Sequence, residues 1–235
     1  MYFKKHIFII SIFSIISLLI FLPSCNEIMK GMRISEGYIE FDISYPKITE
    51  ENNDLEGLMP SEMVYKFKDH KSSYTFNVAM GIFKATFISD SKKREILHLI
   101  KLLNKKYGLV MDEKEALEMN ANISNVKLNF TDETKEIAGY KCKKVEASYE
   151  EEGRIEKFDL YYTDEINVDN PNWSTPFHEI KGVLMEYQFY RYDFLMKFTA
   201  KKVVKKNIKD SEFEFPEDYE AITIKEMEDL FLTFK

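Results

Sequence analysis

Few residues of this chain have the type and spacing needed for covalent chemistry, and the first of them is Cys25. The chain has two cysteines. Cys25 directly follows an apolar run, whereas Cys142 lies between Lys141 and Lys143. A thiol can act as a nucleophile, bind a metal, form a disulfide or carry a modification. Two cysteines without a C-x-x-C spacing predict neither a redox motif nor a disulfide framework. The segment before Cys25 must therefore explain its position.

That segment has the pattern of an export signal. Lys4 and Lys5 precede residues 7–22, a run without a charged side chain. A basic start followed by an apolar core is typical of a signal peptide. As a helix at about 1.5 Å per residue, the run would extend roughly 24 Å, which is shorter than the roughly 30 Å hydrocarbon core of a bilayer. We therefore expect cleavage, with an uncleaved anchor as the alternative.

The residues Leu22-Pro23-Ser24-Cys25 resemble the lipobox of bacterial lipoprotein precursors, with an aliphatic residue at −3 and a small residue at −1. The resemblance implies a diacylglyceryl thioether on Cys25, cleavage before it and acylation of the new amine. Because two membrane signals already give stable anchoring, three acyl chains would hold the protein durably at a membrane. An ordinary secretory peptide is the alternative. The predicted organisation is a signal peptide at 1–24, a lipidated tether at 25–35 and one domain at 36–235.

The residue after the cysteine bears on localisation. Asn26 is not the aspartate that the lipoprotein sorting rule links to inner-membrane retention, and no acidic run follows Cys25. The resemblance therefore implies an exported, lipid-anchored protein, at the periplasmic face of the outer membrane. The chain has 33 Lys and Arg against 40 Asp and Glu, a net charge of −7. This acidic balance argues against a nucleic-acid partner.

Catalytic and metal-binding motifs are absent from the sequence. His6 lies in the expected signal peptide, and His70, His98 and His178 are far apart. There is no H-E-x-x-H, no G-x-S-x-G and no glycine-rich phosphate loop. A carboxylate pair for glycoside cleavage stays open, because 40 acidic residues always offer some pair. We predict no catalytic residues, no metal site and no cofactor, and an envelope hydrolase is the least favoured class.

Alternating apolar and polar residues predict a β-rich domain. A period of two marks strands in EGYIEFDISYP, EMVYKFKD, SSYTFNV, IFKATFIS and NVKLNF. Further strands are expected in residues 134–166, with a bend or bulge at Gly139-Tyr140, and in VLMEYQFY, DFLMKFTAKKVVKK and EFEFP. Short helices are expected after Asp112, with Glu115 three positions on, and after Thr223, with Glu226 as its capping-box partner.

Residues 94–111 fit two structures. The apolar positions of REILHLIKLL suit helical spacing, but Asn104 and Lys105 could also turn a hairpin into YGLVM. The pattern alone leaves both open.

The segment TKEIAGYKCKKVEASYEEEGRIEKFDLYYTDEI resembles the matching part of the GLPGLI family of bacterial exported proteins. Residues 182–186, GVLME, are similar to the family's signature strand, although residues 179–182 keep only its last glycine. IKDSEFEFPEDYEAITIKEM is similar to the ending of related exported domains. The resemblance implies a mainly β (α+β) fold like that of the lipoprotein carriers LolA and LolB. In such a fold a curved, incompletely closed antiparallel sheet surrounds an apolar cavity, with a few short helices. It also implies the hairpin at 94–111.

Our first hypothesis is a non-enzymatic envelope protein, anchored by lipid on Cys25, whose half-barrel binds an acyl chain, a lipid or another lipoprotein. The family resemblance itself implies nothing directly about the ligand. Methionine and aromatic side chains suit a cavity of variable shape, but they can equally fill a core. Our candidate inward-facing cavity residues are Met63, Tyr65, Phe67, Val126, Leu128 and Leu184.

Trp173, the only tryptophan, lies in the proline-containing stretch 167–182. It is the candidate recognition residue of an exposed loop, or else a staple that closes the rim of the barrel. The first possibility belongs to the alternative function: a structural or adaptor lipoprotein that holds a protein partner in an envelope complex.

Overall fold

The structure is a computed structural model, and it describes residues 33–48, 59–78, 81–119, 126–151, 154–191 and 194–232. The chain divides into two units, Met1–Arg33 and Ile34–Lys235. The expected signal peptide and Cys25 lie outside the described residues. Within the described part, no helix is long and apolar enough to span a membrane.

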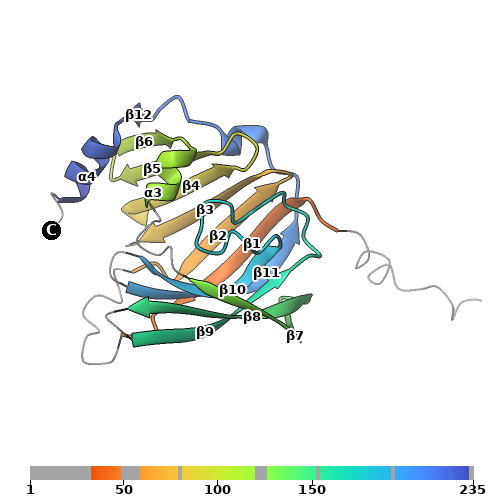
Figure 1. Cartoon of the computed structure of the whole chain (residues 1–235). Coiled ribbons are helices and arrows are strands. Elements are labelled where there is room, and N and C mark those ends of the chain that lie inside the picture. The colour runs from red at the N-terminus through yellow and green to blue at the C-terminus, as the bar shows by residue number, and fades with distance from the viewer. Residues whose placement is uncertain are drawn as a thin grey trace, which may run out of the picture. The chain divides into compact units, whose positions relative to one another are not determined.

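The second unit is built on one twelve-stranded sheet (Figure 1). Its strands are β1 (Glu36–Ser44), β2 (Glu62–Lys68), β3 (Lys71–Val78), β4 (Phe83–Asp90), β5 (Glu95–Leu102), β6 (Lys105–Met111), β7 (Lys127–Ile137), β8 (Tyr140–Glu151), β9 (Arg154–Thr163), β10 (Val183–Arg191), β11 (Phe194–Lys205) and β12 (Glu220–Ala221). Their order is β12-β6-β5-β4-β3-β2-β1-β11-β10-β9-β8-β7. All neighbours are antiparallel except β12 and β6.

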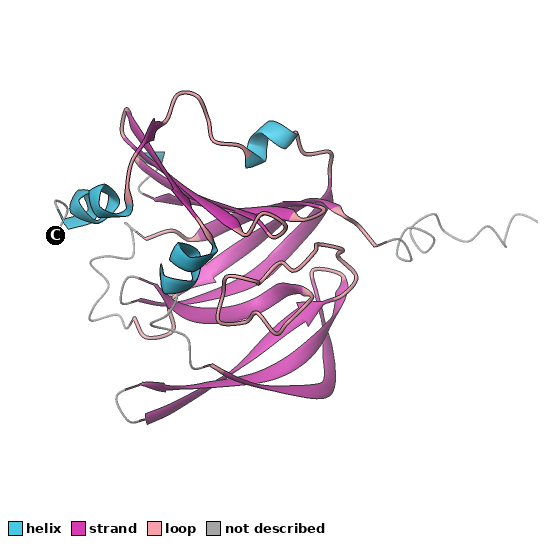
Figure 2. Cartoon of the chain, turned by 45° about the horizontal axis from the view of Figure 1, so that its top comes forward, coloured by secondary structure: helices cyan, strands magenta, loops and turns pink. Residues whose placement is uncertain are grey.

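The sheet curves strongly but does not close, so β7 and β12 remain as its edges (Figure 2). The described helices are short: α3 (Glu113–Met119), the 3-10 turn η4 (Asp210–Phe213) and α4 (Ile224–Leu232). The predicted class, a curved and incompletely closed antiparallel sheet with a few short helices, is confirmed.

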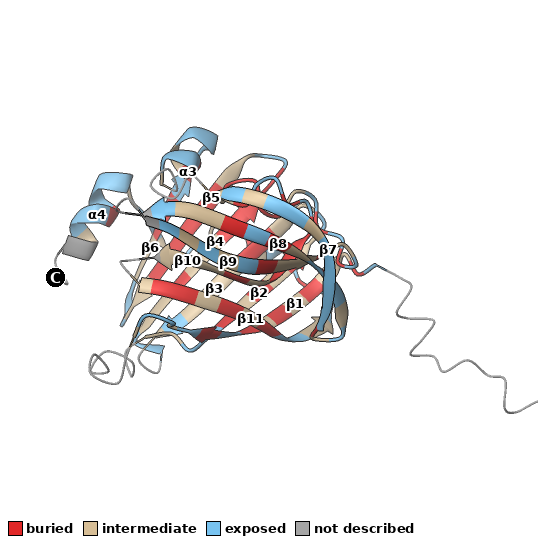
Figure 3. Cartoon of the chain, turned by 60° about the horizontal axis from the view of Figure 1, so that its bottom comes forward, coloured by how far each residue is buried: buried red, intermediate tan, exposed pale blue. Residues whose placement is uncertain are grey.

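The period of two in the sequence marks the concave face of the sheet. In β2, Met63, Tyr65 and Phe67 are buried, whereas the intervening Val64 and Lys66 are partly exposed. Such alternation is expected where one face of a sheet packs on a core and the other meets water. Figure 3 shows buried residues along the central strands and exposed ones on β7, α3 and α4.

Residues 94–111 form the hairpin β5–β6, as the family resemblance implied. Helical spacing also fitted because β5 is buried on both faces. Ile96 and Ile100 pack inward with Trp173, while Leu97 and Leu99 pack outward against Phe213. A strand covered on both sides loses its alternation.

Two expected features are wrong. The bend or bulge at Gly139-Tyr140 is a tight hairpin turn between β7 and β8, in which Ala138 and Gly139 both have positive φ angles of 51° and 83°. Two such residues are typical of a type I′ turn. The expected strand EFEFP is instead η4 and an extended stretch, and Phe213 and Phe215 pack on the outer face of β4 and β5. Side-chain packing holds this segment, not strand pairing.

Both expected helix starts are confirmed. In α3, Glu115 N donates to Asp112 Oδ1 at 2.9 Å, and Asp112 N donates to Glu115 Oε2 at 3.1 Å. In α4, Thr223 N donates to Glu226 Oε2 at 2.7 Å, and Glu226 N donates to Thr223 Oγ1 at 3.2 Å. These reciprocal bonds satisfy amide groups that a helix start leaves without partners.

The strands run between two ends of the sheet. We name the end at which β1 begins the tether end. The β2–β3 and β4–β5 turns lie at the same end, because Glu36 pairs with Lys68 and Lys71 pairs with Asp90. We name the opposite end of the sheet the mouth end. The β3–β4, β5–β6 and β10–β11 connections lie there. In Figure 1, β1 begins on the right and β5 ends on the left.

Candidate functional site

The concave face carries a cluster of aromatic rings toward the mouth end. Its members come from β3, β10, β11 and the residue after β1. We define the aromatic cluster as Tyr45, Phe76, Tyr187, Phe189, Phe194 and Phe198.

The curvature of the sheet brings these rings together. Phe198 stacks on Tyr187 and Phe189, with ring centroids 4.9 and 5.3 Å apart, and Phe76 meets it edge-on at 6.2 Å. Strands β3 and β11 are separated by β2 and β1, so on a flat sheet they would lie roughly 14 Å apart. Tyr45 meets Phe194 edge-on at 6.5 Å. The cluster therefore exists only because the sheet is bent.

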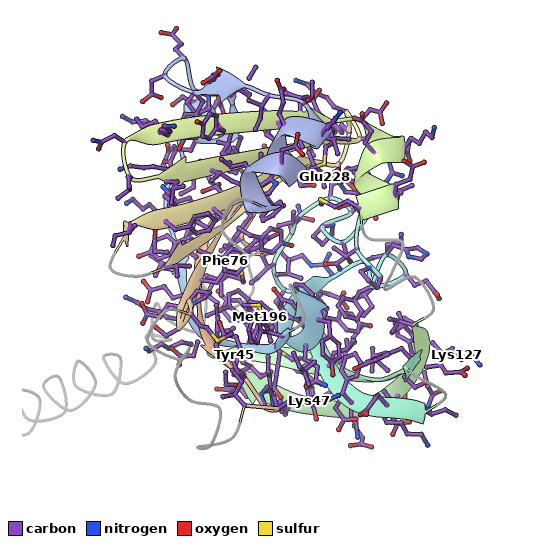
Figure 4. The ribbon with its side chains drawn as sticks, turned by 90° about the vertical axis from the view of Figure 1, so that its left-hand side faces the viewer. Tyr45, Lys47, Phe76, Lys127, Met196 and Glu228 are labelled. Atoms are coloured by element: carbon purple, nitrogen blue, oxygen red, sulfur yellow. The ribbon has the colours of Figure 1, made fainter. Side chains whose placement is uncertain are left out.

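Part of this apolar surface stays accessible. Phe198 and Tyr187 are buried, but Tyr45, Phe76, Phe189 and Phe194 are only partly buried. Figure 4 looks in from the mouth side and labels Phe76, Met196 and Tyr45 between the upper and lower parts of the sheet. Partly exposed aromatic side chains on a concave face can take an apolar ligand without covalent chemistry.

The hydroxyl of Tyr45 is tied to the chain. It donates to the carbonyl of Pro60 at 2.7 Å, and burial raises the pKa of Tyr45 to about 12. The phenol is thus neutral at any physiological pH, and the ring is held in place at the entrance.

Deeper in the concavity the interior is filled. Phe41, Tyr65, Tyr74, Leu184 and Tyr187 surround a space of about 10 Å³, enough for about one water molecule. Burial raises the pKa of Tyr65, Tyr74 and Tyr187 above the usual tyrosine value. Tyr74 raises the pKa of Tyr65 further, and Tyr65 and Tyr74 raise that of Tyr187. The interior is uncharged here.

The stretch 167–182 fills the concavity from the tether end. Asn172 Nδ2 donates to the carbonyls of Ile180 and Gly182 at 2.7 and 2.9 Å, which closes the stretch on itself. Phe177 and Ile180 are buried in the main core. Residues 167–182 therefore occupy the concave side of the sheet, and we call them the plug. The sequence alone did not indicate this position.

The structure brings the six candidate cavity residues into one core cluster. Met63, Tyr65, Phe67 and Leu184 are buried in it, and Val126 and Leu128 pack partly buried against it. Only Tyr65 and Leu184 border the small enclosed space. Leu128 lines a separate groove of about 390 Å³ along β7, β8 and β9. The aromatic cluster, which sequence reasoning missed, supplies further partly exposed apolar surface on the concave face. In the sequence, the cluster was marked by aromatic residues two positions apart in β10, Tyr187 and Phe189. In β11 it was marked by Phe194 and Phe198, which are four positions apart.

Trp173 lies inside the fold, not on an exposed loop. Its side chain is 4% exposed, and its indole Nε1 donates to Ser89 Oγ at 2.8 Å. The Arg94 guanidinium lies 5.0 Å from the ring centre. The ring packs with Ile96 and Ile100 on the inner face. This is the position that the staple alternative requires.

Groups that could perform covalent chemistry are enclosed or isolated. Cys142 is fully buried, and burial raises the pKa of its thiol to about 12. No group of three potential metal ligands occurs among the described residues.

A polar cleft of about 640 Å³ lies at the tether end. Its lining includes Asp69, His70, Lys92, Asp169 and Lys181. His70 Nε2 lies 3.8 Å from Asp90 Oδ2, too far for a hydrogen bond. Lysines and carboxylates of the cleft balance each other, and no nucleophile lies beside the histidine in the described lining.

Comparisons with known proteins give little guidance. No protein-family model matches the chain, and no curated protein matches it either. Among solved structures, the chain is similar to a beta-barrel-like protein of domain of unknown function DUF1849 from Brucella abortus. That match has a TM-score of 0.37 and 10% sequence identity, and it covers 75% of this chain and 100% of that one. The neighbour's function is itself unknown. Similarity at this level says nothing about ligand or partner.

Proposed function

We propose that this chain is a non-enzymatic, lipid-anchored cell-envelope protein whose half-barrel binds an apolar ligand at its mouth end. The ligand class is an acyl chain, a lipid or the lipid of another lipoprotein. The observation that carries the proposal is the partly exposed aromatic cluster on the concave face. The lipobox-like residues Leu22-Pro23-Ser24-Cys25, followed by Asn26, support anchoring through Cys25 at the periplasmic face of the outer membrane.

Burial of apolar surface supplies the affinity in this proposal. Each Å² of apolar surface removed from water contributes about 25 cal/mol. The partly exposed rings of Phe76, Phe189 and Phe194 offer that surface. Met196 beside them can adjust its shape to the ligand (Figure 4).

A fluorescent apolar probe tests the proposal. The material is residues 26–235, which omits the signal and Cys25. We expect it to fold because Ile34–Lys235 contains its own sheet and core. N-phenyl-1-naphthylamine should gain fluorescence on binding, and a fatty acid should displace it.

Substitutions locate the site. Phe76→Glu and Phe189→Glu should each weaken probe binding about tenfold or more, because a carboxylate must be desolvated in the site. Val110→Glu is the matched control, since Val110 is 48% exposed and belongs to the opposite face of β6 from the inward-packing Leu109 and Met111. Equal binding by all three folded variants would refute the assignment.

The alternative is an adaptor that holds a protein partner. The filled space near Tyr65 and Leu184 favours it, as does the long, exposed edge strand β7. An edge strand offers unpaired backbone groups to a partner strand. A photo-crosslinking residue at Glu136 should then capture a protein in the envelope, whereas one at Phe76 should not.

A further inference from the structure

Two neighbouring turns at the mouth end expose aliphatic side chains. Ile82, next to β4, is 48% exposed, and Leu103, between β5 and β6, is 63% exposed. Leu103 N donates to the carbonyl of Ile82 at 2.9 Å, so the two turns are held side by side. Folding makes little use of this apolar surface, which points to a contact outside the chain.

Leu103 also has an unfavourable backbone conformation. Its φ angle is 53°, in the left-handed region. Glycine and asparagine adopt this region readily, whereas a bulky side chain is strained there. The next residue in the sequence, Asn104, is polar, so this turn accommodates a polar side chain. A strained and exposed leucine is the kind of outlier found at functional sites.

Lysines lie beside these turns on the outer face. Lys84, Lys101 and Lys106 are direct cross-strand neighbours on β4, β5 and β6. Directly opposed like charges destabilise a sheet. Lys106 pairs with Asp218, but no described carboxylate lies within ion-pair distance of Lys84 or Lys101. Burial and the charges of Lys66 and Lys101 lower the pKa of Lys84. The nearby carboxylates offset these charges only in part. Glu212 acts on Lys84 but is paired with Lys66, and Asp218 acts on Lys101 but is paired with Lys106.

We propose that Ile82 and the β5–β6 turn form a contact edge for an anionic lipid bilayer. Ile82 and Leu103 enter the interface between headgroups and acyl chains, while Lys84 and Lys101 meet headgroup phosphates. Aliphatic tips flanked by lysines with long flexible stems match the polarity change across that interface. This inference goes beyond the proposed function and does not depend on lipidation of Cys25. Together with the proposed ligand site, it brings the mouth of the half-barrel to a membrane.

A bilayer fits this edge better than a protein does. The two apolar tips, Ile82 and Leu103, come from separate segments of the chain. On a fluid lipid surface each lysine contributes separately. Each lysine near the surface strengthens binding to anionic lipid about fivefold. The exposed Lys105 adds to the same surface.

Vesicle flotation of residues 26–235 tests the inference. The protein should float with phosphatidylcholine vesicles that contain about 30% phosphatidylglycerol, and much less with pure phosphatidylcholine. Binding should fall as salt rises. The double variant Lys84→Gln/Lys101→Gln should weaken binding about 25-fold. The matched control Lys92→Gln/Lys93→Gln removes the same charge at the tether end and should bind as the parent does.

Leu103→Asn separates the membrane role from a structural one. Asparagine tolerates the left-handed conformation, so the thermal midpoint should stay equal or rise while vesicle binding falls at least about fivefold. Absence of vesicle binding by the parent would overturn the inference. So would equal losses in the two lysine double variants, or unchanged binding by Leu103→Asn. Binding of N-phenyl-1-naphthylamine by Leu103→Asn should stay unchanged, so failure here is distinct from failure of the ligand site.

Discussion

At the residue scale, Glu186 makes two ion pairs and is itself largely shielded from water. Its side chain is 13% exposed and lies 2.8 Å from Lys135 Nζ and 3.1 Å from Lys197 Nζ. Burial alone would raise the pKa of Glu186, but the hydrogen bonds from both lysines outweigh it and lower the pKa below its usual value. The ionised form is therefore favoured in the folded state.

This pKa shift predicts a pH dependence of stability. The unfolded chain takes up the proton at the usual glutamate pKa, whereas the folded chain takes it up at a lower pH. The stabilisation is thus complete above the usual pKa and is lost as pH falls through the lowered folded value. Glu186→Gln should remove that contribution, costing about 1 kcal/mol at neutral pH. Urea unfolding of both proteins between neutral and acidic pH checks this, and parallel curves would contradict it.

Cys142 gives a second prediction at this scale. The thiol is fully buried and its pKa is raised to about 12, so almost no thiolate is present or accessible at pH 8. In residues 26–235, where it is the only cysteine, Ellman's reagent should not react within minutes. It should react fully in denaturant. Fast reaction of the folded protein would show that this part of the sheet opens.

At the scale of elements, the start of β10 depends on a close backbone approach. A Cβ at Gly182 would lie 2.6 Å from the carbonyl oxygen of Thr163 and 2.5 Å from the ring of Tyr162. Gly182→Ala should destabilise the protein by about 2 to 3 kcal/mol, because the backbone of β9 cannot easily move away.

Gly108→Ala is the comparison variant for this prediction. A Cβ at Gly108 would meet the ring end of Phe215 at 2.5 Å and no backbone atom within 3 Å. A partly buried ring in an extended segment can shift more easily than a paired strand. Thermal unfolding should therefore rank Gly182→Ala as the less stable, and the reverse order would contradict our account of β10.

Local sequence patterns predicted most of the elements, and the exceptions have physical causes. Alternation marked β2 because one face is buried and the other is wet. The same alternation could not distinguish a helix from a hairpin in residues 94–111, because β5 is covered on both faces. EFEFP alternates as a strand does, yet Phe213 and Phe215 hold it by packing on β4 and β5 without strand pairing. The helix start at Thr223 could be predicted from the sequence because its capping partner, Glu226, lies only three residues away.

At the scale of the whole molecule, the site was less predictable than the fold. Met63, Tyr65 and Phe67 were correctly placed inward, because one strand's pattern fixes its face. Which inward residues stay accessible depends on the bending that brings β3 and β11 together, and on the plug formed by 167–182. Trp173 shows the same limit, since its burial depends on contacts with β4 and β5 far along the chain.

Chain length sets what the tether allows. If Cys25 is lipidated, the nine residues to Ile34 reach at most about 30 Å at roughly 3.3 to 3.6 Å per residue. A lipidated Cys25 would therefore keep the start of the domain within about 30 Å of the membrane.

The most direct test of the central claim, that the half-barrel binds an apolar ligand at its mouth end, is native mass spectrometry of gently purified residues 26–235, followed by organic extraction of the bound material. The account predicts a one-to-one adduct with the mass of a fatty acid or phospholipid, retained by Val110→Glu and lost in Phe76→Glu. A bare protein mass, unchanged after incubation with phospholipid and identical in both variants, would contradict it and direct the search to a protein partner at β7.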